Sequence, residues 1–183
     1  MNQSPKECKN KDVIRELERF FKDNPNALND IAIGFSARFK LIGDGRVPQY
    51  KTSGAACADC YARIEPHKDN PEVDYIVIHP HQRTLVPLGF AMALPIGYEA
   101  VIRPRSGLTK QGIDGQIGTI DSDYRGEVSA CLVNNSDAPF KVRNGDRICQ
   151  MKIQRAERLP FALVDELDET ERGEGGFGST GIR

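Results

Sequence analysis

The period of the apolar residues changes along the chain, from a helical spacing to an alternating one. Over residues 12–22 the apolar side chains fall on one helical face; they are Val13, Ile14, Leu17, Phe20 and Phe21. Over residues 31–40 apolar residues alternate with small or basic ones, which is the pattern of a half-buried strand. We therefore expect an N-terminal extension, residues 1–30, that contains a short helix, and a β domain that begins at Ile31.

The middle of the chain consists mostly of short β-rich runs separated by Pro, Gly and Asn turns. Such a series predicts an all-β fold, namely a sandwich, jelly roll or barrel, over residues 31–168. Residues 169–183 are too rich in glycine to hold structure unaided, so we expect them to be mobile until they close on a ligand. Beyond residues 31–40, the expected strands are 55–64, 75–79, 83–86, 90–94, 98–103, 127–134, 140–142, 147–154 and 161–164.

Charge and hydropathy narrow the class of protein. The 183 residues carry a net charge of −1, with 28% charged residues of well-mixed sign. They contain no basic block, no signal-peptide core and no apolar run of the roughly 20 residues that cross a bilayer. We expect a soluble intracellular protein, cytoplasmic unless it is directed to the nucleus or an organelle, with no nucleic-acid or membrane partner.

The chain has five cysteines, and the absence of an export signal predicts that they are reduced. Cys57 and Cys60 form a C-x-x-C pair. A zinc site needs further ligands at suitable spacing, and a thioredoxin-like motif opens a helix in a βαβ unit; neither context is visible. We interpret the pair as a coincidence, with a metal or redox role as the alternative.

Residues 118–127, Gly-Thr-Ile-Asp-Ser-Asp-Tyr-Arg-Gly-Glu, hold the most concentrated candidate chemistry. Asp121 and Asp123 precede Tyr124 and Arg125, and the flanking glycines let the backbone approach a ligand closely. Carboxylates packed beside an aromatic ring suggest a general base that faces a small-molecule pocket. The alternative from these residues alone is a polar hairpin with an Asx-turn.

Three further segments offer polar groups. Residues 103–108 end a strand with two guanidinium groups, a hydroxyl and a glycine, which suit phosphate. Residues 144–151 form a turn that feeds a strand, with Arg147 and Gln150 as its polar contributors, and a structural role, in which Asp146 and Arg147 brace the turn, is the stronger interpretation. Residues 173–180 miss the P-loop pattern because the lysine is absent and no strand leads in; the alternative there is an ordinary disordered tail. The candidates are Arg105, Ser106, Gly107, Arg147, Gln150, Arg172, Phe177, Ser179 and Thr180.

Taken together, five segments in this order resemble the motifs of the trimeric dUTP pyrophosphatases (dUTPases). The segments are 53–62, 104–108, 118–126, 145–150 and 172–181, and the resemblance covers residues 31–181. It implies a jelly-roll-like β-barrel and an enzyme that hydrolyses dUTP to dUMP and pyrophosphate. Such an activity limits uracil in DNA and supplies dUMP for dTMP synthesis.

The resemblance also implies a role for each candidate. Asp121 would be the base that deprotonates a water attacking the α-phosphorus, and Tyr124 would pack on the deoxyribose and reject UTP. Asp59 would reach, through water, a Mg²⁺ held mainly by the phosphates. Backbone groups around 112–120 would read uracil. The implied substrate-binding set is Arg105, Ser106, Gly107, Gly118, Thr119, Ile120, Tyr124, Gln150, Arg172, Phe177, Gly178 and Ser179.

In the family three subunits share each pocket, so the resemblance implies a homotrimer whose C-terminal segment closes over a neighbour's site. The chain departs from the usual pattern in two places. Cys57 stands where glycine is common, and Gln116 and Ile117 stand in a hairpin that is usually richer in glycine.

Two other functions are weighed against this one. The dCTP deaminases resemble the dUTPases and share their fold, but they place a glutamate on the strand after the third motif. Residues 128–133 of this chain contain no carboxylate, which argues against a deaminase. A non-catalytic nucleotide-binding or regulatory protein could use the helix of residues 12–22 for docking. The presence of Asp121, Tyr124 and a complete C-terminal motif argues against loss of catalysis.

Overall fold

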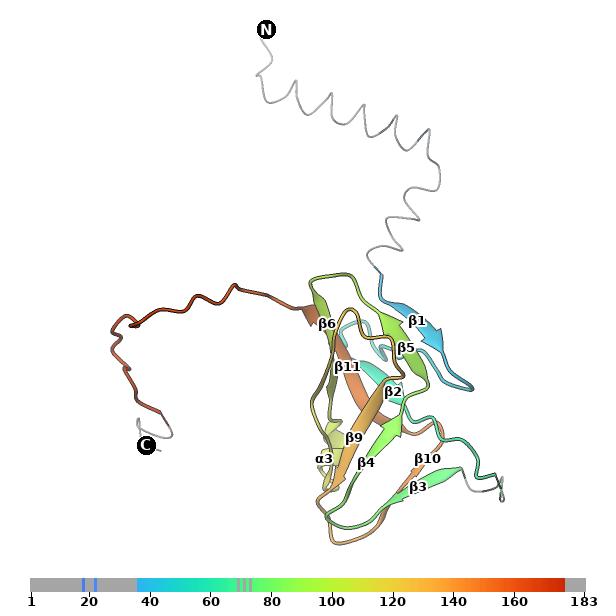
Figure 1. The fold of residues 1–183 in the computed structure, drawn as a ribbon. Coiled ribbons are helices and arrows are strands. Elements are labelled where there is room, and N and C mark those ends of the chain that lie inside the picture. The colour runs from blue at the N-terminus through green and yellow to red at the C-terminus, as the bar shows by residue number, and fades with distance from the viewer. Residues whose placement is uncertain are drawn as a thin grey trace.

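The computed structural model describes residues 18, 22, 36–68, 70, 72 and 74–176. Apart from Glu18 and Lys22, the helix expected over residues 12–22 lies outside the described residues, as does the part of the first expected strand before Ser36. Within the described part, a body of short strands gives way after residue 155 to a segment that runs away from it (Figure 1). No helix there is long and apolar enough to cross a membrane.

Eleven strands and one single-turn helix are present among the described residues. The strands are β1 (Arg38–Leu41), β2 (Ala58–Tyr61), β3 (Tyr75–Ile78), β4 (Arg83–Pro87), β5 (Phe90–Ala93), β6 (Tyr98–Arg103), β7 (Ile113–Gly115), β8 (Gly118–Ile120), β9 (Ser129–Asn134), β10 (Phe140–Arg143) and β11 (Arg147–Arg155), and the helix is α3 (Ser106–Thr109). The all-β prediction is confirmed, and the architecture is jelly-roll-like.

The strands form four antiparallel sheets. They are β2-β11-β6-β8, β4-β9-β7, β1-β5 and β3-β10. Alternating residues of these sheets meet in one core, where Phe90, Ile102, Leu132 and Met151 are fully buried. The edge of the Phe39 ring packs on Phe90, with ring centroids 5.3 Å apart, and this contact attaches β1 to the core.

Strand β9 shows how the sequence selects its buried face. Its residues alternate between half-buried and buried positions, and the buried ones are Ala130, Leu132 and Asn134. A buried amide is tolerated because every polar atom has a partner. The Asn134 amide nitrogen donates to the carbonyls of Ile78 (2.9 Å) and Ala138 (2.8 Å), and its oxygen accepts from Ser136.

The prediction of a strand over residues 161–164 is wrong. Its alternating apolar pattern is real, but Phe161 and Leu163 are fully exposed and the backbone pairs with no neighbour among the described residues. A strand needs a partner for its backbone groups. The body of the fold offers this segment none within one chain.

Candidate functional site

The candidate residues gather in two groups. The first surrounds a hollow of about 320 Å³, which we call the Asp121 hollow. Strand β8 supplies one wall, Asp121 and Tyr124 follow it on a loop, and Glu127 closes the far side. The hollow is lined by Leu85, Ile102, Gly118, Thr119, Ile120, Asp121, Tyr124, Glu127, Val128 and Ser129.

The loop that carries Asp121 and Tyr124 is fixed by its own hydrogen bonds. The Tyr124 amide donates to the Asp121 carbonyl (3.1 Å), and the Tyr124 hydroxyl donates to the Glu127 carbonyl (3.2 Å). Tyr124 folds back over Gly126, where any Cβ would collide with the hydroxyl, so glycine is required for this ring position. The Asp121 carboxylate has neither a hydrogen-bond nor an ion-pair partner within the described part of the chain, which leaves it available to a ligand.

Arg125 braces the same loop. One guanidinium nitrogen of Arg125 donates to the carbonyls of Ser122 and Tyr124, both at 2.8 Å. These bonds satisfy carbonyls that the tight turn leaves without strand partners. Arg125 is therefore committed to the loop rather than to the hollow.

The second group, the Asp59 cluster, consists of Asp59, Arg105, Arg147 and Gln150. Asp59 is only 4% exposed. Gln150 donates to its Oδ1 (3.1 Å) and Arg147 to its Oδ2 (3.0 Å), while the Arg105 Nε lies 3.7 Å from Oδ1. Arg105 also donates to the Arg147 carbonyl (2.5 Å), so the two arginines sit together over one carboxylate.

The buried Asp59 carboxyl has a lowered pKa. Burial by itself would raise the pKa, but the hydrogen bonds from Gln150 and Arg147 and the charges of Arg105 and Arg147 outweigh burial and bring it below the ordinary value of 3.8. The carboxylate is thus held ionised, and it keeps two guanidinium groups oriented.

Ser106 and Gly107 open α3 directly after Arg105. The helix is capped by its backbone, with the Leu108 and Thr109 amides donating to the Arg105 carbonyl at 2.9 Å. A Cβ added at Gly107 would meet nothing within 4 Å, so this stretch of backbone is uncovered on that side. Both residues therefore lie exposed next to the cluster.

The sheet β2-β11-β6-β8 carries residues of both groups. The register pairs Asp59 with Gln150, and Gln150 with Arg103, so these side chains share one face. Ile102 and Ile120, which line the Asp121 hollow, occupy alternate positions and point to the other face. No residue that lines the Asp121 hollow belongs to the Asp59 cluster.

Sequence reasoning assigned no site role to Glu127 and left Arg147 as a possible turn brace. Arg147 and Gln150 are three residues apart, which in a regular strand places them on opposite faces. A register shift between Arg147 and Cys149 turns Arg147 toward Asp59. The turn itself is braced by Asp146, whose Oδ2 accepts from the Arg143 amide (2.8 Å).

Among the C-terminal candidates the structure describes Arg172, which it does not bring to either group. Arg172 is exposed on the segment that leaves the body, where its Nε donates to the Gly175 carbonyl (2.8 Å). Phe177, Gly178 and Ser179 lie outside the described residues.

The C-x-x-C pair belongs to the body of the fold. Cys60 is fully buried on β2 opposite Cys149 of β11. Interaction with the Cys149 thiol, together with burial, strongly raises the pKa of Cys60, which keeps the thiol protonated and unreactive. No group of three or more His, Cys, Asp or Glu side chains that could hold a metal occurs in the part of the chain that the structure describes.

Comparison with protein families matches residues 44–181 to the dUTPase model. The deoxyuridine 5'-triphosphate nucleotidohydrolase of Caulobacter vibrioides is 44% identical over 161 residues, which cover 85% of this chain and 100% of that protein. The enzyme of the same name from Treponema denticola is 48% identical over 146 residues, covering 78% of this chain and 96% of that protein.

Solved structures with the same fold are more distant in sequence. The dUTPase of Staphylococcus bacteriophage 80alpha with dUpNHpp is 21% identical with a TM-score of 0.70, covering 80% of this chain and 99% of that chain. A mutant dUTPase from phage phi11 of S. aureus, described for its coordination of a structural Mg(II) ion, is 17% identical with a TM-score of 0.63, covering 73% and 99%.

The charge network at Asp59 predicts an acid-dependent stability. Because the pKa of Asp59 is lowered on folding, its contribution is fully present above the unfolded pKa, near 3.9, and is lost as the pH falls through the folded pKa. Asp59→Asn should cost about 1–3 kcal/mol at pH 7, and its stability curve should converge on that of the unmodified protein below about pH 4.

Urea unfolding between pH 3 and 7 measures this effect. Asp168→Asn, which removes an exposed carboxylate from the C-terminal segment, is the matched control and should leave the curve unchanged. If the free energy of unfolding of Asp59→Asn stays below that of the unmodified protein by the same amount down to pH 3, the lowered pKa of Asp59 is contradicted.

Proposed function

The chain belongs to the dUTPase family, and on that premise we propose that it hydrolyses dUTP to dUMP and pyrophosphate. The observation that carries the proposal is the Asp121 hollow, where an unpaired carboxylate and a fixed aromatic ring share one small cavity. The family match includes both residues.

The Asp121 hollow is assigned to the nucleoside. Water attacks the α-phosphorus while the Asp121 carboxylate accepts its proton, the bond from phosphorus to the bridging oxygen breaks, and pyrophosphate leaves. The Tyr124 ring lies against the deoxyribose and leaves no space for a 2′-hydroxyl. The backbone of Gly118, Thr119 and Ile120 reads uracil beside them.

The Asp59 cluster is assigned to the triphosphate. Arg105 offers a planar fork of donors that matches phosphate oxygens, and Ser106, Gly107 and Gln150 add neutral donors around it. Asp59 keeps Arg105 and Gln150 in place before substrate arrives, because it already contacts both of them, together with Arg147. Positioning and charge neutralisation are the main protein contributions to phosphoryl transfer.

Magnesium is the proposed cofactor, and the donor set limits how it binds. Both Asp59 oxygens already accept from the cluster, and within the described residues Asp59 belongs to no group of three or more side chains that could hold a metal. This set does not fit an ion held by the protein alone. It fits a Mg²⁺ that the phosphates hold and that meets Asp59 through water, since Mg²⁺ keeps several waters. When bound, the ion neutralises phosphate charge.

The assembly that we propose is a homotrimer with shared sites. The Asp59 cluster shares no residue with the lining of the Asp121 hollow, and we assign the hollow of one subunit and the cluster of another to a single triphosphate. The C-terminal segment, with Arg172, Phe177, Gly178 and Ser179, is assigned to the lid over such a site. Its exposed apolar residues support a contact with another subunit.

Replacing the proposed base gives a direct test. Asp121→Asn should lower kcat for dUTP by about 10²–10⁴-fold while dUTP binding is retained, because the amide keeps the shape but cannot accept the proton. Pyrophosphate release measures kcat, and calorimetry measures binding. Asp123→Asn, two residues away and outside the hollow, is the matched control. Near-normal turnover by Asp121→Asn would refute the assignment.

Replacing the proposed sugar filter tests specificity. Tyr124→Ala should raise kcat/KM for UTP relative to dUTP by about 10- to 100-fold, since the ring that excludes the 2′-hydroxyl is gone. Tyr50→Ala, at an exposed tyrosine outside the hollow, should leave the ratio unchanged. An equal ratio in Tyr124→Ala and the unmodified protein would remove Tyr124 from this role.

A further inference from the structure

Arg63 is a mostly buried cation that the proposed reaction does not use. It follows β2, its side chain is 13% exposed, and its guanidinium faces three carboxylates. Nη2 bonds Glu65, Nε lies 3.7 Å from Asp44, and Nη1 lies 3.5 Å from Glu127. Two of these partners, Asp44 and Glu65, are mostly exposed, whereas Glu127 is mostly buried.

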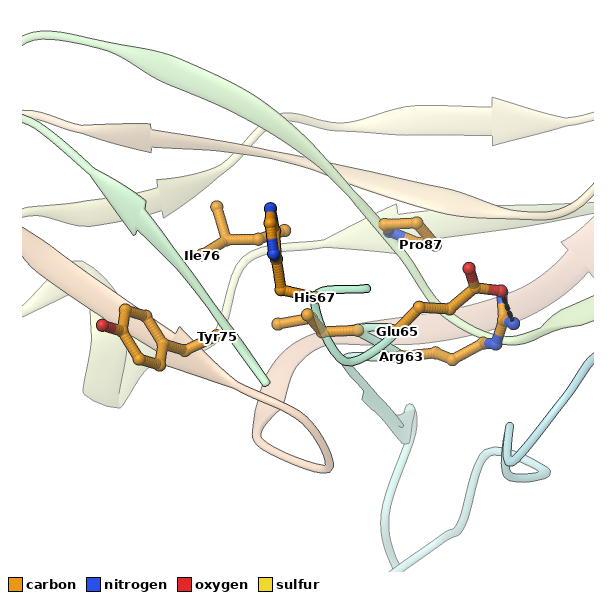
Figure 2. A pocket seen from close by; sticks show the side chains of 7 residues that line it. Arg63, Glu65, His67, Tyr75, Ile76 and Pro87 are labelled. Carbon is orange, nitrogen blue, oxygen red and sulfur yellow. Dashed lines mark hydrogen bonds and ion pairs between the residues drawn. The ribbon is translucent and has the colours of Figure 1, made fainter. Parts of the chain in front are cut away.

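Arg63 also borders a separate hollow of about 420 Å³. Figure 2 shows Arg63 and Glu65 joined at one end of it, with His67 and Tyr75 farther along. The three carboxylates neutralise the guanidinium, so it is not available as a ligand for an anion there. The role of Arg63 therefore depends on the further contacts that these carboxylates make.

Glu127 connects Arg63 to the Asp121 hollow. Its Oε1 accepts from Arg63 (3.5 Å) and from the Gly89 amide (3.1 Å), and the residue lines the hollow. Its backbone carbonyl accepts the Tyr124 hydroxyl at 3.2 Å. A continuous series of contacts therefore runs from the Arg63 guanidinium through both ends of Glu127 to the Tyr124 ring.

The surroundings allow Arg63 little movement. A Cβ on Gly89 would lie 2.9 Å from the Arg63 Cδ, and a Cβ on Gly43 would lie 2.7 Å from its Nη2. Gly89 and Gly43 have positive φ, of 72° and 56°, a conformation that favours glycine. The backbone at both positions therefore lies close against the Arg63 side chain. The residue after Glu127 is fixed as well, because the Val128 amide donates to the Phe90 carbonyl at 2.9 Å.

We propose that Arg63, acting through Glu127, is a positioning residue for sugar discrimination. It sets the place of the carbonyl that receives the Tyr124 hydroxyl, and so it sets how closely the ring approaches the sugar. The proposal rests on the proposed function, because it assigns a role in the same site. Without Arg63, the Glu127 carboxylate keeps one neutral donor, the Gly89 amide, and the ring gains freedom that admits a 2′-hydroxyl.

The test compares kcat/KM for dUTP and UTP in variants of the full chain. Arg63→Gln and Glu127→Gln should each lower the dUTP-to-UTP ratio by about tenfold, and the double variant should fall no further, because both break the same link. Tyr124→Phe, which removes the hydroxyl but keeps the ring, should give a similar fall. Glu65→Gln is the matched control: it removes another Arg63 partner without touching Glu127, and should keep the ratio.

The outcomes separate a specific role from a structural one. A merely structural Arg63 would lower activity on both nucleotides together, in step with a lower urea midpoint and without a change of ratio. An unchanged ratio in Arg63→Gln and Glu127→Gln, or an equal fall in Glu65→Gln, overturns the proposal. If Arg63→Gln does not fold, Glu127→Gln decides alone. If the unmodified protein does not hydrolyse dUTP, the proposed function fails instead.

Discussion

The alternation of side chains across the sheet β2-β11-β6-β8 governs the rest of the structure. Neighbouring positions on a strand point to opposite faces, and the register fixes which residues share a face. Asp59, Gln150 and Arg103 are thereby placed on one side, and the core residues Ile102 and Ile120, which also line the Asp121 hollow, on the other. The Asp121 hollow and the guanidinium groups of the Asp59 cluster are therefore separate features of one chain.

In both the Asp59 cluster and the Asp121 hollow, hydrogen bonds and ion pairs hold the side chains in place without a ligand. The ionised Asp59 keeps Arg105 and Arg147 side by side, which offsets the repulsion between two cations. At the Asp121 hollow, Gly126 lets Tyr124 fold back onto the Glu127 carbonyl, and Arg63 holds the carboxylate of that same residue. Ordering these groups in advance reduces the entropy lost on binding.

The sequence predicted the elements whose pattern is local. The bounds of β6 agree with the expected strand, because its apolar run ends at Arg103-Pro104. Features that depend on distant contacts were not predictable in this way. The register shift that brings Arg147 to Asp59 has no signal in the sequence, and the pattern of residues 161–164 indicated a strand for which one chain provides no partner. The Arg63–Glu127 pair joins residues 64 positions apart.

Complementation between two inactive variants tests the proposed sharing of sites between subunits most directly. Arg105→Ala damages the Asp59 cluster and Asp121→Asn damages the hollow, so each variant alone should have little activity. When the two are co-expressed in equal amounts, sites that combine an intact hollow with an intact cluster should restore about a quarter of the normal dUTP hydrolysis. Activity no greater than the mean of the two separate variants would show that each chain completes its own site.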